Sequence, residues 1–92
     1  MAGRIEGYMH SDSITKNKGG CLIRVTCDTD FAANTKEFTV FCAAAVRFCY
    51  AVDSALWSDV ATAYPDIEAI RLDTEEALKE RITVTTITIL KL

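Results

Sequence analysis

The sequence predicts an α+β domain, a three-stranded antiparallel sheet with helices packed on one face. Residues 21–28 alternate with a period of two, which is typical of a strand with one buried face. Between residues 38 and 52 the apolar side chains recur at helical spacing instead. Strand-like segments stand before and after the helical region, so a hairpin is later joined by a third strand. We expect one domain over residues 1–92, because a chain of 92 residues has room for only one.

The first two strands form the predicted hairpin. Ile5–His10 is a short strand candidate that places Ile5, Gly7 and Met9 on one side. The polar stretch Ser11–Gly20 ends in Lys-Gly-Gly and indicates the hairpin loop. In the strand Cys21–Asp28, one face consists of Cys21, Ile23, Val25 and Cys27, and the other of Leu22, Arg24, Thr26 and Asp28.

Helices are predicted after the hairpin. Thr29 is a suitable cap for a short helical turn over Asp30–Ala33. Asn34 followed by Glu37 is a variant of the capping box and predicts the start of a longer helix that reaches Val52. The apolar stripe of that helix, which we expect to cover the sheet, comprises Phe38, Phe41, Cys42, Ala45, Phe48, Cys49 and Val52.

The segment from residue 53 to residue 81 is less regular. Ser58–Tyr64 is expected to form a helical turn that Pro65 ends, because the residue before a proline avoids the helical conformation. Asp66–Leu72 is expected to be another short element. Thr74 then opens a final helix whose first turn is acidic, as the positive end of a helix favours.

The last predicted strand, Ile82–Leu92, changes phase along its length. Ile82 and Val84 lie on one side, whereas Ile87 and Ile89 lie on the other. A bulge near Thr85-Thr86 would reconcile the two halves, as would burial of both faces. Because the helices cover only one face of the sheet, we expect one of these two apolar pairs to point to the open face.

Composition excludes several classes of protein. The chain is 50% hydrophobic and 25% charged, which argues against disorder. Its net charge of −3 argues against binding to nucleic acid, which favours a basic surface. No apolar run reaches the roughly 18–20 residues of a membrane span, and the N-terminus lacks the pattern of a secretory signal. We therefore expect a cytoplasmic protein.

The four cysteines do not indicate a metal site. No Cys-x-x-Cys pair is present, and the single histidine, His10, is remote in sequence from Cys21, Cys27, Cys42 and Cys49. A secreted disulfide scaffold fits poorly with an uninterrupted apolar core pattern. The favoured interpretation is four buried free thiols in a reducing compartment.

Little in the sequence indicates an enzyme. A Ser-His or Cys-His device would have to use His10, which is expected to be a solvated side chain beside the hairpin loop. Asp28 and Asp30 could serve as acid or base only in a cleft that the sequence does not show. Lys18-Gly19-Gly20 lacks the spacing of a phosphate-binding loop. We expect no enzymatic activity, no cofactor and no metal.

The junction Cys27-Asp28-Thr29-Asp30-Phe31 is the unusual feature of the chain. In one interpretation, Phe31 folds back into the core and Asp30 sits at a helix N-terminus. In the other, Asp30 and Phe31 project together into a partner as an aromatic anchor that carries a carboxylate.

The same segment resembles a family signature. Residues 24–34, Arg-Val-Thr-Cys-Asp-Thr-Asp-Phe-Ala-Ala-Asn, followed by Glu37-Phe38, are similar to the signature of translation elongation factor Ts, usually Glu-Val-Asn-Cys-Glu-Thr-Asp-Phe-Val-Ala-Arg-Asn-Glu-Glu-Phe. Glu6–His10 resembles the first strand of that family, and residues 82–86 its last strand. The resemblance spans roughly residues 5–92 and implies the fold of the elongation factor Ts dimerisation domain.

The resemblance implies a function. Members of this family bind elongation factor Tu and promote GDP release, which is guanine nucleotide exchange in protein biosynthesis. In this sequence Asp30 and Phe31 would be the wedge that disturbs the magnesium and phosphate end of the nucleotide site, and Thr29 would hold the turn. Thr29, Asp30 and Phe31 are therefore the predicted partner-binding residues.

The sequence also departs from the family pattern. Arg24 stands for the usual Glu, Ala32 for the usual Val, and Thr85-Thr86 for the usual Arg pair. The N-terminal helical domain and the second core copy of the family are expected to be absent. Family members with one core subdomain pair through the sheet, so the resemblance implies a homodimer. Two alternatives remain: binding to elongation factor Tu without exchange, and a purely structural α+β homodimer.

Overall fold

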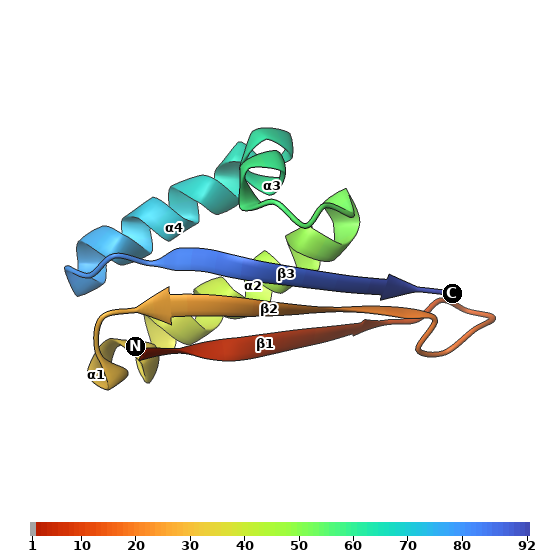
Figure 1. Ribbon diagram of the computed structural model, residues 1–92, viewed down its shortest axis with the longest axis horizontal. Coiled ribbons are helices and arrows are strands. Elements are labelled where there is room, and N and C mark those ends of the chain that lie inside the picture. The colour runs from red at the N-terminus through yellow and green to blue at the C-terminus, as the bar shows by residue number, and fades with distance from the viewer. Residues whose placement is uncertain (1) are drawn as a thin grey trace.

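The sheet is flanked by helices in the order that the sequence predicts. The structure, a computed structural model, describes residues 2–92; Met1, part of the predicted domain, lies outside them. The elements are β1 (Ala2–His10), β2 (Gly19–Cys27), α1 (Asp30–Ala33), α2 (Lys36–Val52), α3 (Trp57–Ala63), α4 (Pro65–Leu78) and β3 (Thr83–Lys91). Strand β2 is central and pairs antiparallel with β1 and β3 (Figure 1). The predicted α+β fold is confirmed.

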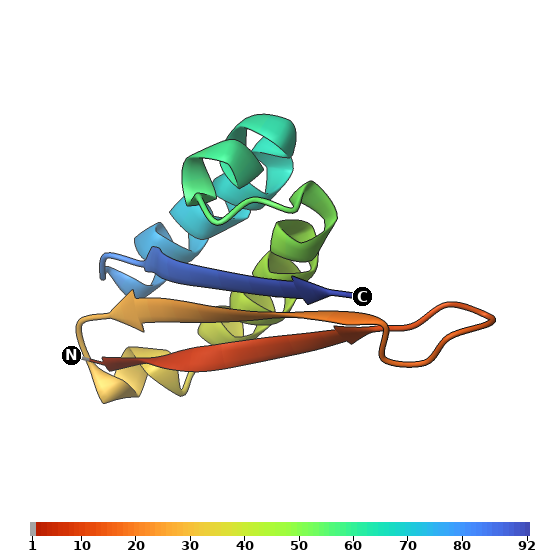
Figure 2. The same ribbon diagram turned by 45° about the vertical axis from the view of Figure 1, so that its right-hand side comes forward.

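Helix α2 covers one face of the sheet. It packs against β1 and β2, and α3 and α4 pack against α2 on the side of β3 (Figures 1 and 2). The predicted apolar stripe of this helix faces the core: Phe38, Phe41, Cys42, Ala45 and Cys49 are buried, with Phe48 and Val52 partly so. These side chains meet the buried face of β2, which consists of Cys21, Ile23, Val25 and Cys27, as predicted.

Both strands of the hairpin are longer than their sequence patterns suggest. β1 begins at Ala2 instead of Ile5, and β2 begins at Gly19 instead of Cys21. Gly3 has φ +148° and lies so close to the backbone of Val25 that a Cβ atom would clash there. Pairing over this stretch therefore depends on a glycine, which a pattern of apolar residues does not reveal.

Strand β3 contains the predicted bulge. Arg24 pairs with Thr86 and Val25 pairs with Val84, which leaves Thr85 as the extra residue on β3. The prediction that one apolar pair of this strand points to the open face is wrong. The extra residue restores the phase, so the side chains of both pairs face the helices: Ile82, Val84 and Ile87 are buried and Ile89 is partly buried.

The caps of α1 and α2 differ by one residue from the prediction. Thr35, and not Asn34, caps α2: its side chain accepts a hydrogen bond from the backbone N–H of Phe38 at 3.2 Å. Asn34 ends α1, and its amide donates to the carbonyl oxygen of Asp30 at 2.8 Å. A one-turn helix thus takes Asn34 for its own C-terminus and leaves the next residue to cap α2.

Helix α4 is one continuous element. The separate helix predicted to begin at Thr74 is wrong, because Thr74 lies inside α4 and its hydroxyl donates to the carbonyl oxygen of Ile70 at 2.7 Å. Pro65 begins this helix as well as ending α3, since a proline fits the first helical position. No single helix within residues 2–92 combines the length and apolarity of a membrane span, although α2 and α3 meet that test jointly, across a bend of 88°.

Candidate partner-binding site at the α1 tip

The three predicted site residues lie together where β2 ends. We call residues 28–33 the α1 tip. Thr29 has an extended backbone, and its hydroxyl oxygen accepts a hydrogen bond from the backbone N–H of Ala32 at 3.2 Å. Its carbonyl oxygen accepts from the backbone N–H of Ala33 at 3.2 Å and from the thiol of Cys27 at 3.3 Å. Thr29 therefore forms the N-cap that the sequence predicts.

The tip has an inner and an outer side. Ala32 and Ala33 are buried and join α1 to the core. Asp30 is exposed, and the ring of Phe31 is 83% exposed. Phe31 is thus not a core residue, which contradicts the first of the two interpretations on this point, whereas Asp30 does lie at the N-terminus of α1. An exposed aromatic ring beside a carboxylate, on a support of buried alanines, can serve as an anchor for a partner.

A residue outside the α1 tip, Glu80, contacts it and was missed in the sequence analysis. The carboxylate of Glu80 accepts hydrogen bonds from the backbone N–H groups of Asp28 and Thr29, both at 3.0 Å, and another from the hydroxyl of Thr29. These donors lower the pKa of the Glu80 carboxyl, because they favour its charged form. Glu80 stands 51 positions from Thr29 in the chain, so no local spacing could have indicated the contact.

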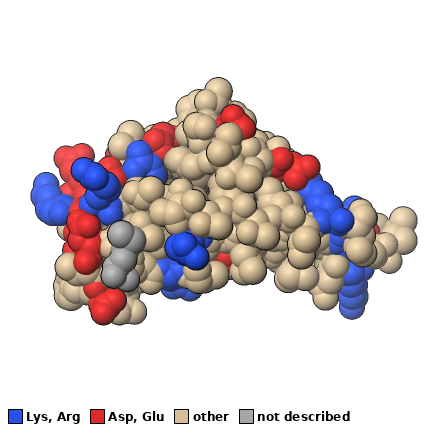
Figure 3. Space-filling model, in the orientation of Figure 1, with Lys and Arg blue, Asp and Glu red and all other residues tan. Residues whose placement is uncertain are grey.

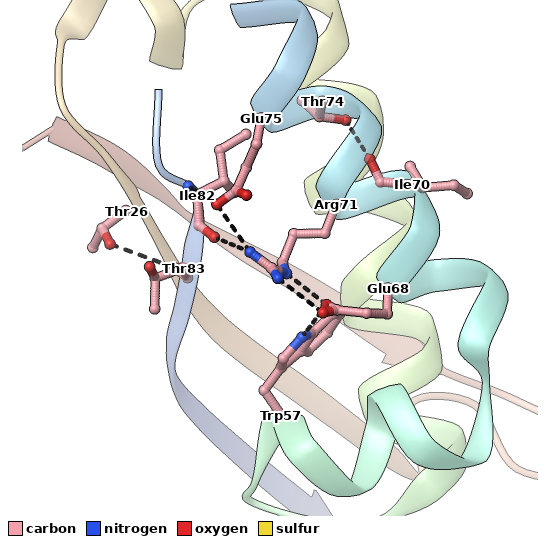
Figure 4. A network of polar contacts seen from close by, with 9 residues as sticks. All are labelled: Thr26, Trp57, Glu68, Ile70, Arg71, Thr74, Glu75, Ile82 and Thr83. Atoms are coloured by element: carbon pink, nitrogen blue, oxygen red, sulfur yellow. Dashed lines mark hydrogen bonds and ion pairs between the residues drawn. The ribbon is translucent and has the colours of Figure 1, made fainter. Parts of the chain in front are cut away.

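A polar network holds the segment from which Glu80 extends (Figure 4). The guanidinium of Arg71 contacts both carboxylate oxygens of Glu68, one carboxylate oxygen of Glu75 at 3.0 Å and the carbonyl oxygen of Ile82 at 2.8 Å. Glu75 also accepts from the backbone N–H of Ile82 at 2.8 Å, and the indole of Trp57 donates to Glu68 at 2.9 Å. The Glu68 contact raises the pKa of Arg71, and Arg71 lowers that of Glu68. The network fixes the end of α4 to the start of β3.

The remaining candidate groups are placed as follows. A hollow of about 660 Å³ lies beside the tip, lined by Asp28, Leu72, Glu75, Glu76, Lys79, Glu80 and Arg81.

His10 is not simply solvated as expected: its Nδ1 atom lies 2.8 Å from the hydroxyl of Tyr8, and its ring centroid lies 4.9 Å from that of Tyr50. Within residues 2–92, no three His, Cys, Asp or Glu side chains are placed to hold a metal ion.

All four cysteines are buried free thiols, as predicted. Burial raises their pKa, to about 12 for Cys42 and about 12 for Cys49. A thiol with so high a pKa is protonated at neutral pH and is a poor nucleophile. The cysteines therefore act as core side chains in this fold.

The open face of the sheet carries an apolar patch beside Arg24 and several threonines, through other residues than predicted. Ile5, Met9, Leu22 and Leu90 are each more than half exposed on this face. Gly7 and Gly20 carry no side chains there, and a hollow of about 660 Å³ lies among these residues. Figure 3 shows that charged side chains gather toward the two ends of this view and that uncharged atoms cover most of its centre.

The comparisons with known proteins bear on this geometry. No family model matches the chain. Forty residues of it are 48% identical to elongation factor Ts of Rubrobacter xylanophilus. Part of the chain is elongation factor Ts-like. The matched segment is 44% of this chain and covers only 18% of that relative, so the similarity is to one part of that protein.

Proposed function

We propose that this protein binds elongation factor Tu and promotes the release of GDP through Asp30 and Phe31. The observation that carries the proposal is the exposure of Phe31, 83% on a one-turn helix whose other side is buried. Burying a phenylalanine ring in a partner contributes roughly 1.5–3 kcal/mol, so a tip of this kind is suited to binding. The similarity to elongation factor Ts supports the choice of partner.

The proposed action is binding and not chemistry. A protein that binds the nucleotide-free form of a GTPase more tightly than the GDP form lowers the affinity for GDP by the same factor. In this proposal Phe31 enters the nucleotide-binding domain as a wedge, Asp30 brings a negative charge to the phosphate end of the site, and Thr29 holds the turn. The protein itself needs no cofactor, acts as no enzyme and works in the cytoplasm during protein biosynthesis.

A release assay tests the proposal. Elongation factor Tu is loaded with fluorescent GDP, and the loss of signal is followed with and without this protein in excess unlabelled GDP. Wild type is expected to accelerate release, and Phe31→Ala is expected to abolish the acceleration while the fold is unchanged. Ile14→Ala is the matched control, because Ile14 is also an exposed apolar side chain but lies on the hairpin loop at the other end of the sheet (Figure 1).

Two outcomes of this assay, read together with a pull-down of elongation factor Tu, reject the proposal. Binding to elongation factor Tu without acceleration favours a binding protein that does not exchange nucleotide. Failure of wild type to bind at all favours a purely structural role for the domain. Unfolding of Phe31→Ala, measured by circular dichroism, would contradict the assignment of Phe31 to a partner-binding surface.

We further propose that two copies pair through the open face of the sheet. Four exposed apolar side chains on this face, together with the hollow at Gly7 and Gly20, favour sheet-on-sheet packing. Leu22 lies at the centre of this face, and Leu22→Asp is expected to give a monomer in analytical ultracentrifugation. Val40→Asp, at a similarly exposed position on α2, is the control and should stay dimeric. A monomeric wild type would reject the dimer.

A further inference from the structure

We propose that Glu80 is a positioning residue that holds the α1 tip in the orientation in which it meets its partner. The inference rests on the proposed function, since it concerns how the tip is presented. Glu80 does not touch Asp30 or Phe31 through any hydrogen bond in the structure; it acts through the two residues that precede them.

The contacts of Glu80 fix the point where the chain leaves the sheet. One carboxylate oxygen accepts from two successive backbone N–H groups, of Asp28 and Thr29, and the other accepts from the hydroxyl of Thr29. Asp28 and Thr29 lie between the last residue of β2 and the first residue of α1. A carboxylate at this point therefore sets the direction in which α1 starts, and Phe31 is two positions further on.

The tip needs support of this kind. A four-residue helix has one turn, and helices far shorter than about 12 residues are not stable by themselves in water. The local support consists of the Thr29 cap, the hydrogen bonds that Cys27 and Asn34 donate to carbonyl oxygens of the tip, and the burial of two alanines. None of these contacts fixes the backbone N–H groups of Asp28 and Thr29, whereas Glu80 binds both.

Glu80 is itself held from both sides. Lys79 has φ 58° and ends α4, and the backbone N–H of Glu80 then donates to the carbonyl oxygen of Glu75 at 3.3 Å. Ile82 is fixed by Glu75 and Arg71. The three-residue segment between α4 and Ile82 is thus anchored at both ends, so the Glu80 side chain presents its carboxylate from a fixed base.

Hydrogen bonds favour the charged form of this carboxylate. The titratable and charged groups around it are Cys27, Asp28, Glu75, Glu76, Lys79 and Arg81. Hydrogen bonds from Thr29 and Asp28 lower the pKa of Glu80, so the side chain is an acceptor for all its donors at neutral pH. Protonation would convert one of the accepting oxygens into a donor.

The experiment compares three variants of the full chain. Glu80→Ala removes the acceptor, Glu80→Gln keeps one accepting oxygen without the charge, and Glu76→Ala removes an exposed carboxylate that lines the same hollow. Each is tested in the GDP-release assay, and the backbone amide of Thr29 is followed by NMR through its pH titration and its hydrogen exchange.

Glu80→Ala is expected to slow the stimulated release of GDP about tenfold, since freeing the backbone of even one tip residue costs about that factor. The Thr29 amide should exchange faster in this variant and not in Glu76→Ala. Glu80→Gln should retain most of the stimulated release. In Glu80→Gln, the NMR signal of the Thr29 amide should lack the pH titration that wild type shows below the ordinary Glu pKa of 4.5.

Three results would overturn the inference. The first is unchanged Thr29 exchange and unchanged GDP release in Glu80→Ala. The second is loss of release in Glu80→Ala and Glu80→Gln alike with an unaltered Thr29 amide, which would make Glu80 a direct partner contact. The third is an equal effect of Glu76→Ala. If the wild-type protein does not stimulate GDP release from elongation factor Tu, the proposed function is rejected but this inference is not. The NMR measurements still decide whether Glu80 holds the α1 tip.

Discussion

The two turns that flank β2 both present an exposed apolar side chain, but they are held in different ways. In the hairpin loop, Ile14 is 92% exposed, and Asp12 accepts hydrogen bonds from the backbone N–H groups of Ile14 and Thr15 at 2.8 and 2.6 Å. Asp12 also pairs with Lys18 at 2.7 Å. At the α1 tip, Phe31 is exposed, and the turn before it is held by Glu80.

The difference lies in the distance along the chain. The loop contacts of Asp12 join residues two to six positions apart, whereas the Glu80 contacts join residues 51 and 52 positions apart. The hairpin loop can therefore form its contacts by itself. The tip acquires its orientation only when α4 and β3 are in place, so its geometry depends on the whole fold.

The largest expected effect comes from removing a core side chain of α2. Phe38→Ala deletes a fully buried ring in the first turns of α2 and is expected to lower the free energy of unfolding by about 3–5 kcal/mol. Urea denaturation measures this loss. Amide hydrogen exchange at Thr29 should become faster, while exchange at Ile14 should stay close to wild type. Equal loss of protection at both turns would contradict the comparison.

A smaller effect is expected from the network behind the tip. Arg71→Met removes the donors that bind Glu68, Glu75 and the carbonyl oxygen of Ile82, and should cost about 2 kcal/mol of stability. Arg81→Met, at an exposed position nearby, is the control and should stay within about 0.5 kcal/mol of wild type. Urea midpoints decide between these values, and equal midpoints for the two variants would show that the network is not stabilising.

The N-cap of the tip gives the next effect. Thr29→Ala loses both the cap of α1 and a donor to Glu80, and the expected cost is about 1 kcal/mol. Thr29→Ser keeps the hydroxyl and should recover most of this loss in thermal denaturation. If serine and alanine are equally destabilising, the methyl group and not the hydroxyl of Thr29 carries the effect.

The pH dependence of stability tests the charged contacts of both turns. Hydrogen-bond donors lower the pKa of Asp12 and of Glu80 in the folded protein. A carboxyl whose pKa is lower in the folded state stabilises that state above its unfolded value, and the contribution is lost as the pH falls through the folded value. The urea midpoints of Glu80→Gln and Asp12→Asn should therefore lie below wild type at pH 7, and the difference should begin to narrow only below the ordinary values of 4.5 for Glu and 3.8 for Asp.

The smallest effect is expected at the hairpin loop. Ile14→Ala should change the free energy of unfolding by less than about 0.5 kcal/mol, because its side chain packs against almost nothing in the monomer. In this variant, the Thr29 amide should exchange its hydrogen at the wild-type rate. A larger change in concentration-dependent unfolding would indicate that Ile14 lies in the contact between two copies.

Local patterns predicted most of the fold. The period of two in β2 and the apolar stripe of α2 each depend on neighbouring residues and were sufficient to place these elements and their buried faces. The division of α4 at Thr74 was wrong because a threonine can bond back to the preceding turn as well as cap the next one. The bulge in β3 was predicted, but the face was wrong because the bulge brings both apolar pairs to the helix side and leaves neither pair on the open face.

The candidate site was predicted only in part. The exposed pair Asp30 and Phe31 and the cap at Thr29 follow from three adjacent residues and a family resemblance. Glu80 and the Arg71 network depend on contacts between α4, β3 and the end of β2. A single sequence contains no signal for such pairs, because a glutamate near a helix end is common and its partner is set by the tertiary fold.

The burial of all four cysteines gives the protein an internal reporter of its own unfolding. A thiol-alkylating reagent can reach Cys42 and Cys49 only when the helix that carries them separates from the sheet. The rate of modification, followed by mass spectrometry without any added label, therefore measures how often the core opens. Modified forms that carry one or two groups would reveal partial openings, whereas an abrupt change from none to four would show that the domain opens as a unit.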